Sequence, residues 1–373
     1  MPVLLSTVVA CWVALAPVQE AAPTPAGVLT QALDALQQRS LYATRVDWPA
    51  LRTQLTADLA KDNTMARAHQ LIQQAVAALK DPHTRFEPPP APQKPAPATA
   101  PAPATAPAPA TAPAPATAPA AAPAQPAATP TVPTEPSAKM TPQKLGYVML
   151  PPANSQDPAD LRAYGSTLYM LVSHLANFNA HGWIVDLRLD GGGNMWPMLV
   201  GLQPILGNGT YGTSTAPGGQ RWTFGCEGAQ AWLEQNGTRT QQFMTDARPV
   251  RERPAGQKIA VLIGPWTMSS GEFVAASFAG MEGVRFFGKP TGGLTTATEP
   301  VALADGSKLI LATSQLINRA GTLLDGPIQP DQDVSWGDWP TDDDDAVKAA
   351  TAWLLAPATP PSGAPHGNQG STR

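Results

Sequence analysis

The chain is poor in cysteine: only Cys11 and Cys226 occur among its 373 residues. Two cysteines make no disulfide framework, and the paired spacings that bind zinc are absent. No group of His, Cys, Asp or Glu shows the spacing of metal ligands, so we expect no metal and no other cofactor. The net charge is −4 and no cluster of Lys or Arg occurs, which argues against nucleic acid as a partner.

Long hydrophobic runs are absent too. The N-terminal stretch MPVLLSTVVACWVALAPVQE is apolar over a length too short for a stable membrane anchor. It resembles an export signal, although it lacks the Lys or Arg that normally opens one. We therefore expect residues 1–25 to be a leader and the protein to be exported, to the periplasm or the cell exterior; a frayed apolar tail is the alternative. VVAC, ending at Cys11, is similar to a lipidation box, but the apolar residues after it disfavour lipidation.

Large side chains are missing from residues 88–144, where Ala, Pro and Thr dominate and PAPAT recurs. Such a segment buries too little apolar surface to offset the entropy of ordering, and its prolines favour extended polyproline conformations. We predict a disordered Ala/Pro-rich linker here and a disordered tail over residues 357–373. Two folded pieces remain, residues 26–87 and 145–356, enough for one large core and a small appendage.

The two pieces differ in hydrophobic periodicity. Residues 26–87 carry apolar residues at three- and four-residue intervals, which predicts an N-terminal helical subdomain of two or three helices. Residues 145–356 instead alternate near-continuous apolar runs, such as GWIVDLRL and KIAVLIG, with helical patterns. This alternation predicts an α/β core with a mixed or largely parallel sheet flanked by helices. Sites in such sheets lie at the carboxyl ends of the strands.

One strand-to-helix turn, PWTMSSGEF, carries Ser269 three residues before Glu272. This S-x-x-E spacing is that of a helix capping box, in which the two side chains only satisfy backbone N–H groups. Alternatively, Ser269 is a nucleophile beside the free N–H groups and the positive end of a helix. The G-x-S-x-G and S-x-x-K motifs of other serine hydrolases are absent, so the turn alone leaves both interpretations open.

Two further loops carry candidate groups. DGGGN follows a buried strand, and its glycines either permit a tight turn with positive φ or let backbone N–H groups approach a substrate carbonyl. No G-K-[ST] follows them, which argues against a phosphate loop. His83 lies in a loop beside Asp81, just past a helix. A histidine placed in this way is either structural or a general base.

Six segments, taken together and in this order, resemble the C-terminal processing (tail-specific) serine peptidases, a group that includes tricorn and the nisin-resistance protease. The segments are ALKDPHTRF, LGYVMLP, GWIVDLRLDGGGNMWPM, TMSSGEFVAASF, FFGKPTGG and LLDGPIQPD. The resemblance implies a ClpP/crotonase-like core that hydrolyses peptide bonds through a serine. It implies Ser269 as the nucleophile, with oxyanion donors at the N–H of Ser270 and of Gly192 or Gly193.

The general base differs between the branches of that family. The Ser–Lys branch uses a lysine, but alignment puts Leu294, not Lys289, at its position. The tricorn and nisin-resistance branches take a histidine from the loop after the N-terminal helices, which implies His83 here. Asp325 is the best match for the carboxylate that orients this base. The chain is therefore more similar to the Ser–His branch, and whether Lys289 has any catalytic part stays open.

The PDZ domain that captures substrate tails in many relatives has no counterpart, because the Ala/Pro linker occupies its place. The resemblance thus implies a serine peptidase that acts on peptides or unfolded proteins, and the N-terminal stretch predicts that it is exported without a stable membrane span. The alternative is a catalytically inactive relative that binds an apolar small molecule or peptide. The linker is long enough for the helical piece to dock on the same molecule or on a second copy, so a homo-oligomer also stays open.

Overall fold

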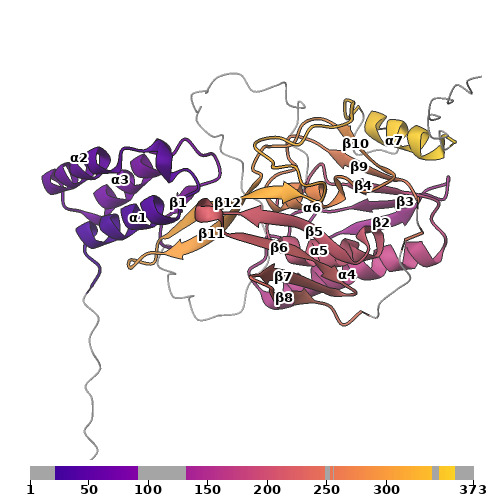
Figure 1. Cartoon of the computed structure of the whole chain (residues 1–373), viewed down its shortest axis with the longest axis horizontal. Helices are drawn as coiled ribbons and strands as arrows, with labels where there is room; N and C mark the ends of the chain where they lie inside the picture. Colours follow the sequence, from indigo (N-terminus) through magenta and orange to yellow (C-terminus); the bar gives the residue numbers. More distant parts are fainter. Residues whose placement is uncertain (1–21, 91–131, 248–252, 255, 338–343, 358–373) are drawn as a thin grey trace, which may run out of the picture.

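The computed structural model describes residues 22–90, 132–247, 253–254, 256–337 and 344–357. Figure 1 shows a group of N-terminal helices at one end, an antiparallel sheet that reaches from them into the body of the molecule, and a second sheet covered by helices. Most of the predicted leader and tail, and the central part of the predicted linker, lie outside the described residues. No helix within the described ranges is long and apolar enough to cross a membrane.

Three helices form the N-terminal piece, as the periodicity predicts. They are α1 (Pro25–Arg39), α2 (Trp48–Lys61) and α3 (Met65–Ala78), with a short 3-10 turn, η1 (Ala43–Arg45), between the first two. Each helix begins at a polar cap: the side chains of Thr24, Asp47 and Thr64 each accept a backbone N–H of the first turn. The chain leaves α3 through Lys80, whose φ is 51°, into the loop that carries His83.

A six-stranded sheet forms the centre of the core, in the order β13-β10-β9-β4-β3-β2. Its strands are β2 (Ser137–Met140), β3 (Gly146–Met149), β4 (Trp183–Asp186), β9 (Ile259–Ile263), β10 (Val284–Gly288) and β13 (Gln332–Asp333). All neighbours are parallel except β2 and β3, which confirms the predicted α/β class. The predicted linker end at residue 144 is wrong, because β2 lies before it and hydrogen-bonds to β3 along the sheet edge.

A second, antiparallel sheet of seven strands was not foreseen from the sequence. Its strands are β1 (Arg85–Glu87), β5 (Gly209–Thr215), β6 (Arg221–Glu227), β7 (Gln230–Gln235), β8 (Thr238–Met244), β11 (Thr296–Ala302) and β12 (Lys308–Asn318), with a 3-10 turn, η2 (Pro217–Gly219), between β5 and β6. The long strand β12 pairs with β11, β1 and β5. It therefore connects the N-terminal piece, which supplies β1, to the body of the molecule.

Helices cover both faces of the parallel sheet. They are α4 (Pro158–Asn177), α5 (Met195–Leu206), α6 (Ser270–Phe278) and α7 (Asp345–Leu355). The alternation of side chains along β9 shows the two faces, because Ile259, Val261 and Ile263 join the cluster that contains residues of α4, α5 and α6. Ala260 and Leu262 point the other way, into a smaller cluster with α7.

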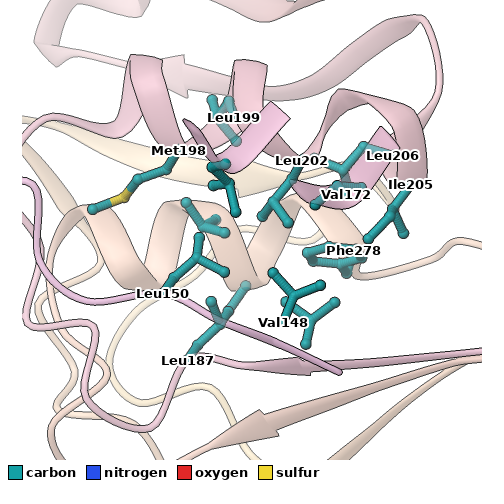
Figure 2. Close-up of a cluster of buried hydrophobic side chains, with 14 of the residues drawn as sticks. Val148, Leu150, Val172, Leu187, Met198, Leu199, Leu202, Ile205, Leu206 and Phe278 are labelled. Carbon is teal, nitrogen blue, oxygen red and sulfur yellow. The ribbon is translucent and has the colours of Figure 1, made fainter. Parts of the chain in front are cut away.

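Helix α5 is buried from Pro197 to Leu206. Figure 2 shows Leu199 and Leu202 of this helix among Leu150 and Leu187 from the parallel-sheet side and Phe278 from the end of α6. Fully burying one such side chain stabilises the fold by about 1.5–3 kcal/mol. This packing holds the chain on both sides of the glycine loop, which lies between β4 and α5.

A separate hydrophobic cluster attaches the N-terminal helices to the antiparallel sheet. Leu36 of α1 and Leu71 of α3 belong to it, together with Leu303, Leu309 and Leu311 from the β11–β12 hairpin. The sequence predicts the helices, but not the hairpin on which they pack. This packing places the loop after α3, which contains His83, against the core.

Candidate active site

Ser269 lies in the turn between β9 and α6, where it is the N-cap of the helix. Its φ is 53° and its ψ is −119°, a conformation that costs a non-glycine residue about 1–3 kcal/mol. The Ser269 N–H donates to the Glu272 carboxylate at 3.1 Å, and the Ser269 carbonyl accepts the Glu272 N–H at 2.9 Å. These bonds hold the strained backbone in place.

Glu272 is fully buried and connects the serine turn to the next loop of the core. Its carboxylate accepts the hydroxyl of Thr291 at 2.5 Å and the N–H of Gly293 at 2.8 Å. Burial raises the pKa of Glu272, and these hydrogen bonds oppose the rise. Helix capping and nucleophile positioning are thus compatible, since Glu272 occupies the Ser269 N–H and the Ser269 hydroxyl faces elsewhere.

His83 is distant from Ser269 in the sequence but lies next to it in the fold. The two atoms Nε2 of His83 and Oγ of Ser269 lie 3.1 Å apart, across a separation of 186 residues. The other ring nitrogen, Nδ1, lies 2.8 Å from Oγ1 of Thr296, a residue of β11. The His83 N–H donates to the Asp81 carboxylate at 3.0 Å, which shapes the loop. The structure therefore brings together a hydroxyl and an imidazole at hydrogen-bonding distance.

His83 is buried, with 5% of the residue exposed. Burial lowers the pKa of His83 below its ordinary value, and the negative charge of Asp81 only partly offsets this effect. The ring is consequently uncharged at neutral pH. A neutral imidazole is the form that accepts a proton from a serine.

Asp325 does not occupy the position implied by the resemblance. Its side chain is exposed, and the partner of His83 Nδ1 is the hydroxyl of Thr296. The charge of Asp325 acts on Tyr42, whose pKa is raised by burial and by the charges of Asp81 and Asp325. Sequence reasoning missed Thr296, because a single threonine at the start of a strand carries no motif.

The two glycines of the candidate oxyanion loop have φ values of 108° at Gly192 and 100° at Gly193. A Cβ atom at Gly192 would lie 2.9 Å from the Cβ of Ser269. A Cβ atom at Gly193 would lie 2.3 Å from the carbonyl oxygen of Ala153. Both sequence interpretations of the loop therefore apply, because positive φ and a close approach to the serine turn each require glycine.

Two backbone N–H groups near Ser269, those of Gly193 and Ser270, have no hydrogen-bond partner among the described residues. The Gly192 N–H donates to Asp190 Oδ1 at 3.1 Å, which leaves the Gly193 N–H as the donor of the loop. Ser270 is the first residue of α6, where a backbone N–H has no partner within the helix. The Ser270 hydroxyl donates to the Gly193 carbonyl at 2.6 Å and so joins the loop to the helix.

Lys289 does not contact Ser269. Its ammonium forms an ion pair with Asp333 at the edge of the parallel sheet, and its side chain is 41% exposed. Leu294 follows Gly293, in the loop that Glu272 holds. Among the described residues, no lysine forms a hydrogen bond with the serine.

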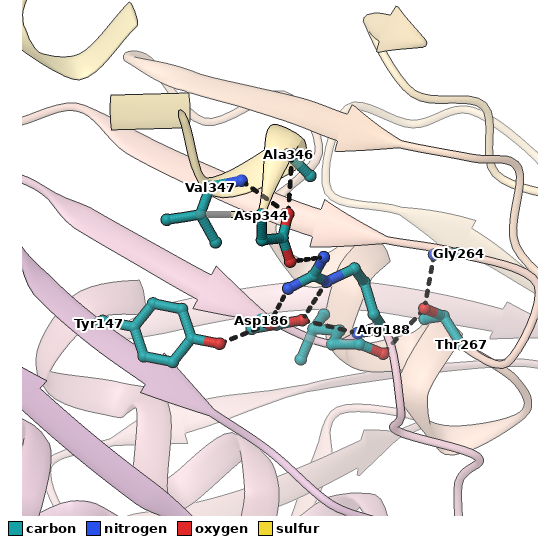
Figure 3. Close-up of polar contacts among 9 residues, drawn as sticks. Tyr147, Asp186, Arg188, Gly264, Thr267, Asp344, Ala346 and Val347 are labelled. Atoms are coloured by element: carbon teal, nitrogen blue, oxygen red, sulfur yellow. Dashed lines mark hydrogen bonds and ion pairs between the residues drawn. The ribbon is translucent and has the colours of Figure 1, made fainter. Parts of the chain in front are cut away.

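A buried charge network supports the segment that leads into the glycine loop. Arg188 contacts Asp186 at 2.6 Å and Asp344, the cap of α7, at 2.5 Å, and Tyr147 donates to Asp186 at 2.6 Å (Figure 3). Burial raises the pKa of Asp186, but the Arg188 guanidinium outweighs it and holds the pKa below its usual value. Thr267, from the serine turn, donates to the Leu187 carbonyl at 2.8 Å. The network and this hydrogen bond thus fix the spacing between the glycine loop and the serine turn.

An α/β core that presents a serine hydroxyl to a buried imidazole, beside backbone donors at a helix start, defines a serine hydrolase type of site. Comparison with known proteins narrows this class. The model of peptidase family S41 matches residues 144–334, about half of the chain. The chain belongs to peptidase family S41, a family of serine peptidases.

The relatives support the same placement. The chain is 34% identical to the nisin-resistance protein of Lactococcus lactis subsp. lactis over 162 residues, which cover 43% of this chain and 48% of that protein. The match thus spans about half the length of this curated relative. A lipoprotein structure from Streptococcus agalactiae has a TM-score of 0.62 at 20% identity, covering 91% of this chain and 99% of that one. The photosystem II D1 C-terminal processing protease has a TM-score of 0.51 at 15% identity, covering 83% and 92%.

Proposed function

We propose that this protein hydrolyses peptide bonds through an acyl-enzyme on Ser269, with His83 as the general base. The observation that carries the proposal is the 3.1 Å distance between Ser269 Oγ and His83 Nε2. Such a contact is the geometric requirement for activating a serine hydroxyl. Membership of peptidase family S41 supports the same reaction.

The geometry supports a two-step reaction. His83 Nε2 takes the proton of Ser269 Oγ as the oxygen attacks the substrate carbonyl, and the N–H groups of Gly193 and Ser270 stabilise the oxyanion. The imidazolium then protonates the leaving amine. Water repeats the sequence on the acyl-enzyme and releases the acid. Thr296 Oγ1 accepts the Nδ1 proton, which keeps the lone pair of Nε2 directed at the serine.

The proposed substrate is a peptide or an unfolded protein, and the proposed location is the cell envelope. Membership of peptidase family S41 supports the substrate class, and the names of the nisin-resistance protein and of the streptococcal lipoprotein support the location. No described domain lies between the N-terminal piece and the core to capture substrate tails.

Labelling by a fluorophosphonate probe, with cleavage of fluorescein-labelled casein in parallel, tests the proposal. We expect the wild type to be labelled and Ser269→Ala to be unlabelled with an unchanged melting temperature, because only the reacting hydroxyl is removed. His83→Ala should slow labelling by about 10²–10⁴-fold, the usual contribution of a general base.

Matched controls are Ser277→Ala, which removes a buried hydroxyl farther along α6, and His174→Ala, which removes an exposed histidine on α4. Both should be labelled at the wild-type rate. Labelling of Ser269→Ala would exclude Ser269 as the nucleophile, and full labelling of His83→Ala would exclude His83 as the base. A folded wild type that neither reacts with the probe nor cleaves casein would contradict the peptidase proposal and favour the ligand-binding alternative.

A further inference from the structure

Asp190 is a buried carboxyl group directly beneath the candidate oxyanion loop. Its exposed fraction is 0%, and its Oδ1 accepts the N–H of Gly192 at 3.1 Å. Its Oδ2 is buried without a hydrogen-bond partner among the described residues. The backbone carbonyl of Asp190 accepts the N–H of Met268, the residue before the nucleophile, at 3.0 Å. One residue thus contacts both loops of the site.

The carboxyl group also packs against the start of α6. A Cβ atom at Gly271 would lie 3.0 Å from the carboxyl carbon of Asp190 and 2.2 Å from its carbonyl oxygen. The carboxyl group is therefore closely packed against the backbone at the start of α6. A buried carboxylate without a cation is costly, and the group avoids the cost by keeping its proton.

The charged and titratable groups nearby do not neutralise Asp190. Arg188 is held by Asp186 and Asp344, on the other side of the segment. Tyr164 of α4 donates its hydroxyl to the Pro151 carbonyl. Burial raises the pKa of Asp190 well above its ordinary value, and the hydrogen bond from the Gly192 N–H only partly opposes the rise.

On α6, the carboxylate of Glu272 is occupied by Thr291 and Gly293. His83 faces Ser269 and Thr296. No ion pair to Asp190 occurs among the described residues. The contrast with Asp186, four positions earlier in the same segment, is direct: Asp186 is paired with the Arg188 guanidinium, and Asp190 has no cation beside it among the described residues.

We propose that Asp190 is a positioning residue of the oxyanion hole that acts as an uncharged carboxylic acid. Its carboxyl group accepts the hydrogen bond of the Gly192 N–H, so the Gly193 N–H is the donor of this loop that is available to the substrate oxygen. Being uncharged, it adds no repulsion to the negative charge that develops beside it during the reaction. The inference rests on the proposed function, because an oxyanion forms only if Ser269 attacks a carbonyl.

Two substitutions separate the hydrogen bond from the charge. Asp190→Asn keeps the acceptor for Gly192 and cannot ionise, whereas Asp190→Leu keeps the approximate shape and removes the acceptor. Asp305→Asn is the matched control, because its carboxyl side chain is 5% exposed but pairs with His69, away from the site. The rate of fluorophosphonate labelling is measured for all four proteins, from acid to alkaline pH.

We expect Asp190→Asn to react at close to the wild-type rate near neutral pH and to keep that rate at alkaline pH, where the wild type declines. Asp190→Leu should be slower by about 100-fold across the pH range, the lower end of what one lost oxyanion donor costs. Asp305→Asn should follow the wild-type pH profile. Equal losses in the Asn and Leu variants, or an unchanged alkaline decline in Asp190→Asn, would overturn the inference.

Thermal unfolding tests the protonation state without using activity. Because the folded-state pKa of Asp190 is raised, the folded protein holds a proton that the unfolded chain releases above about pH 4. Rising pH therefore destabilises the wild type through this group until the folded-state pKa is passed. The melting temperature of Asp190→Asn relative to wild type should therefore increase as the pH rises above about 4. A constant difference would overturn the inference even if the protein proved to be no peptidase.

Discussion

The nucleophile and its base come from regions that are stabilised in different ways. Ser269 lies inside the core, between β9 and α6, and its backbone is held by Glu272 from the first turn of the same helix. His83 lies at the end of the N-terminal piece, which has its own hydrophobic cluster and meets the core through β12. The nucleophile is therefore preorganised by one folding unit, whereas the base is in place only when a second unit has docked.

The docking contact is specific as well as apolar. Thr84, next to His83, donates its N–H to Asp81 at 3.0 Å, and its hydroxyl accepts the Ala312 N–H of β12 at 3.1 Å. The Leu41 N–H donates to the Ala312 carbonyl at 2.9 Å. The base is thus held by hydrogen bonds to the middle of β12, beyond the short pairing with β1. Substitutions in the two regions should affect stability and activity differently.

The largest expected effect on stability is that of Arg188→Leu in the core. It leaves Asp186 and Asp344 buried without a counter-ion, which should cost about 3–5 kcal/mol of unfolding free energy. Arg39→Met is the control, because its ion pair with Glu299 is about half exposed and should contribute less than about 1 kcal/mol. Chemical denaturation measures both, and equal costs would refute the role given to the buried network.

Leu309→Ala should damage the docking of the base. Leu309 is fully buried in the N-terminal cluster, and the substitution should cost about 2–5 kcal/mol. Because His83 depends on this contact, casein cleavage should be lost at temperatures where the core is still folded. Leu145→Ala, in the small cluster under α7, is the control and should lower stability without separating activity from folding. Parallel loss of activity and core structure in Leu309→Ala would contradict the two-unit description.

Thr296→Val should reduce the rate while leaving the fold intact. The substitution removes the hydroxyl beside His83 Nδ1, so the ring is less firmly oriented and kcat should fall by about 10- to 100-fold. Thr296→Ser should retain most activity. Thr313→Val is the matched control, since its buried hydroxyl has no hydrogen-bond partner among the described residues.

The pH–rate profile examines the same histidine. Burial lowers the pKa of His83, and the base works only when deprotonated, so the acid limb of the wild type should lie below the ordinary histidine value of 6.5. A limb above that value would contradict the environment described for His83. An unchanged kcat in Thr296→Val would contradict its positioning role.

The smallest effect is expected for Lys289→Ala. Lys289 is partly exposed and pairs with Asp333, so neither labelling nor casein cleavage should change measurably. Asp333→Ala is the control for loss of the pair. A strong loss of the chemical step in Lys289→Ala alone, with the fold intact, would restore the Ser–Lys mechanism.

The sequence analysis was most successful where local rules apply. The N-terminal helices, the buried strand before DGGGN and the helix after Ser269 all follow from periodicity and capping. It failed for the antiparallel sheet, whose strands are partly polar and are joined through the distant pairings of β12 with β1 and β5. It also failed for the end of the linker, where four residues become a strand only by pairing with β3. Within the site, the resemblance pointed to Asp325 as the partner of His83 and no sequence signal indicated Thr296, because the group beside His83 is decided by the fold.

The sequence by itself determined the α/β class, the turn at Ser269 and the glycines that must take positive φ, because these depend on residues a few positions apart. Only the tertiary structure decided that His83 reaches Ser269 and that Thr296 accompanies it, because a hydrophobic cluster and one long strand carry them there. Likewise, Asp186 and Asp190 are the same residue type in one short segment. The fold lowers the pKa of Asp186 by placing the Arg188 guanidinium beside it and raises the pKa of Asp190 by burying it without a cation.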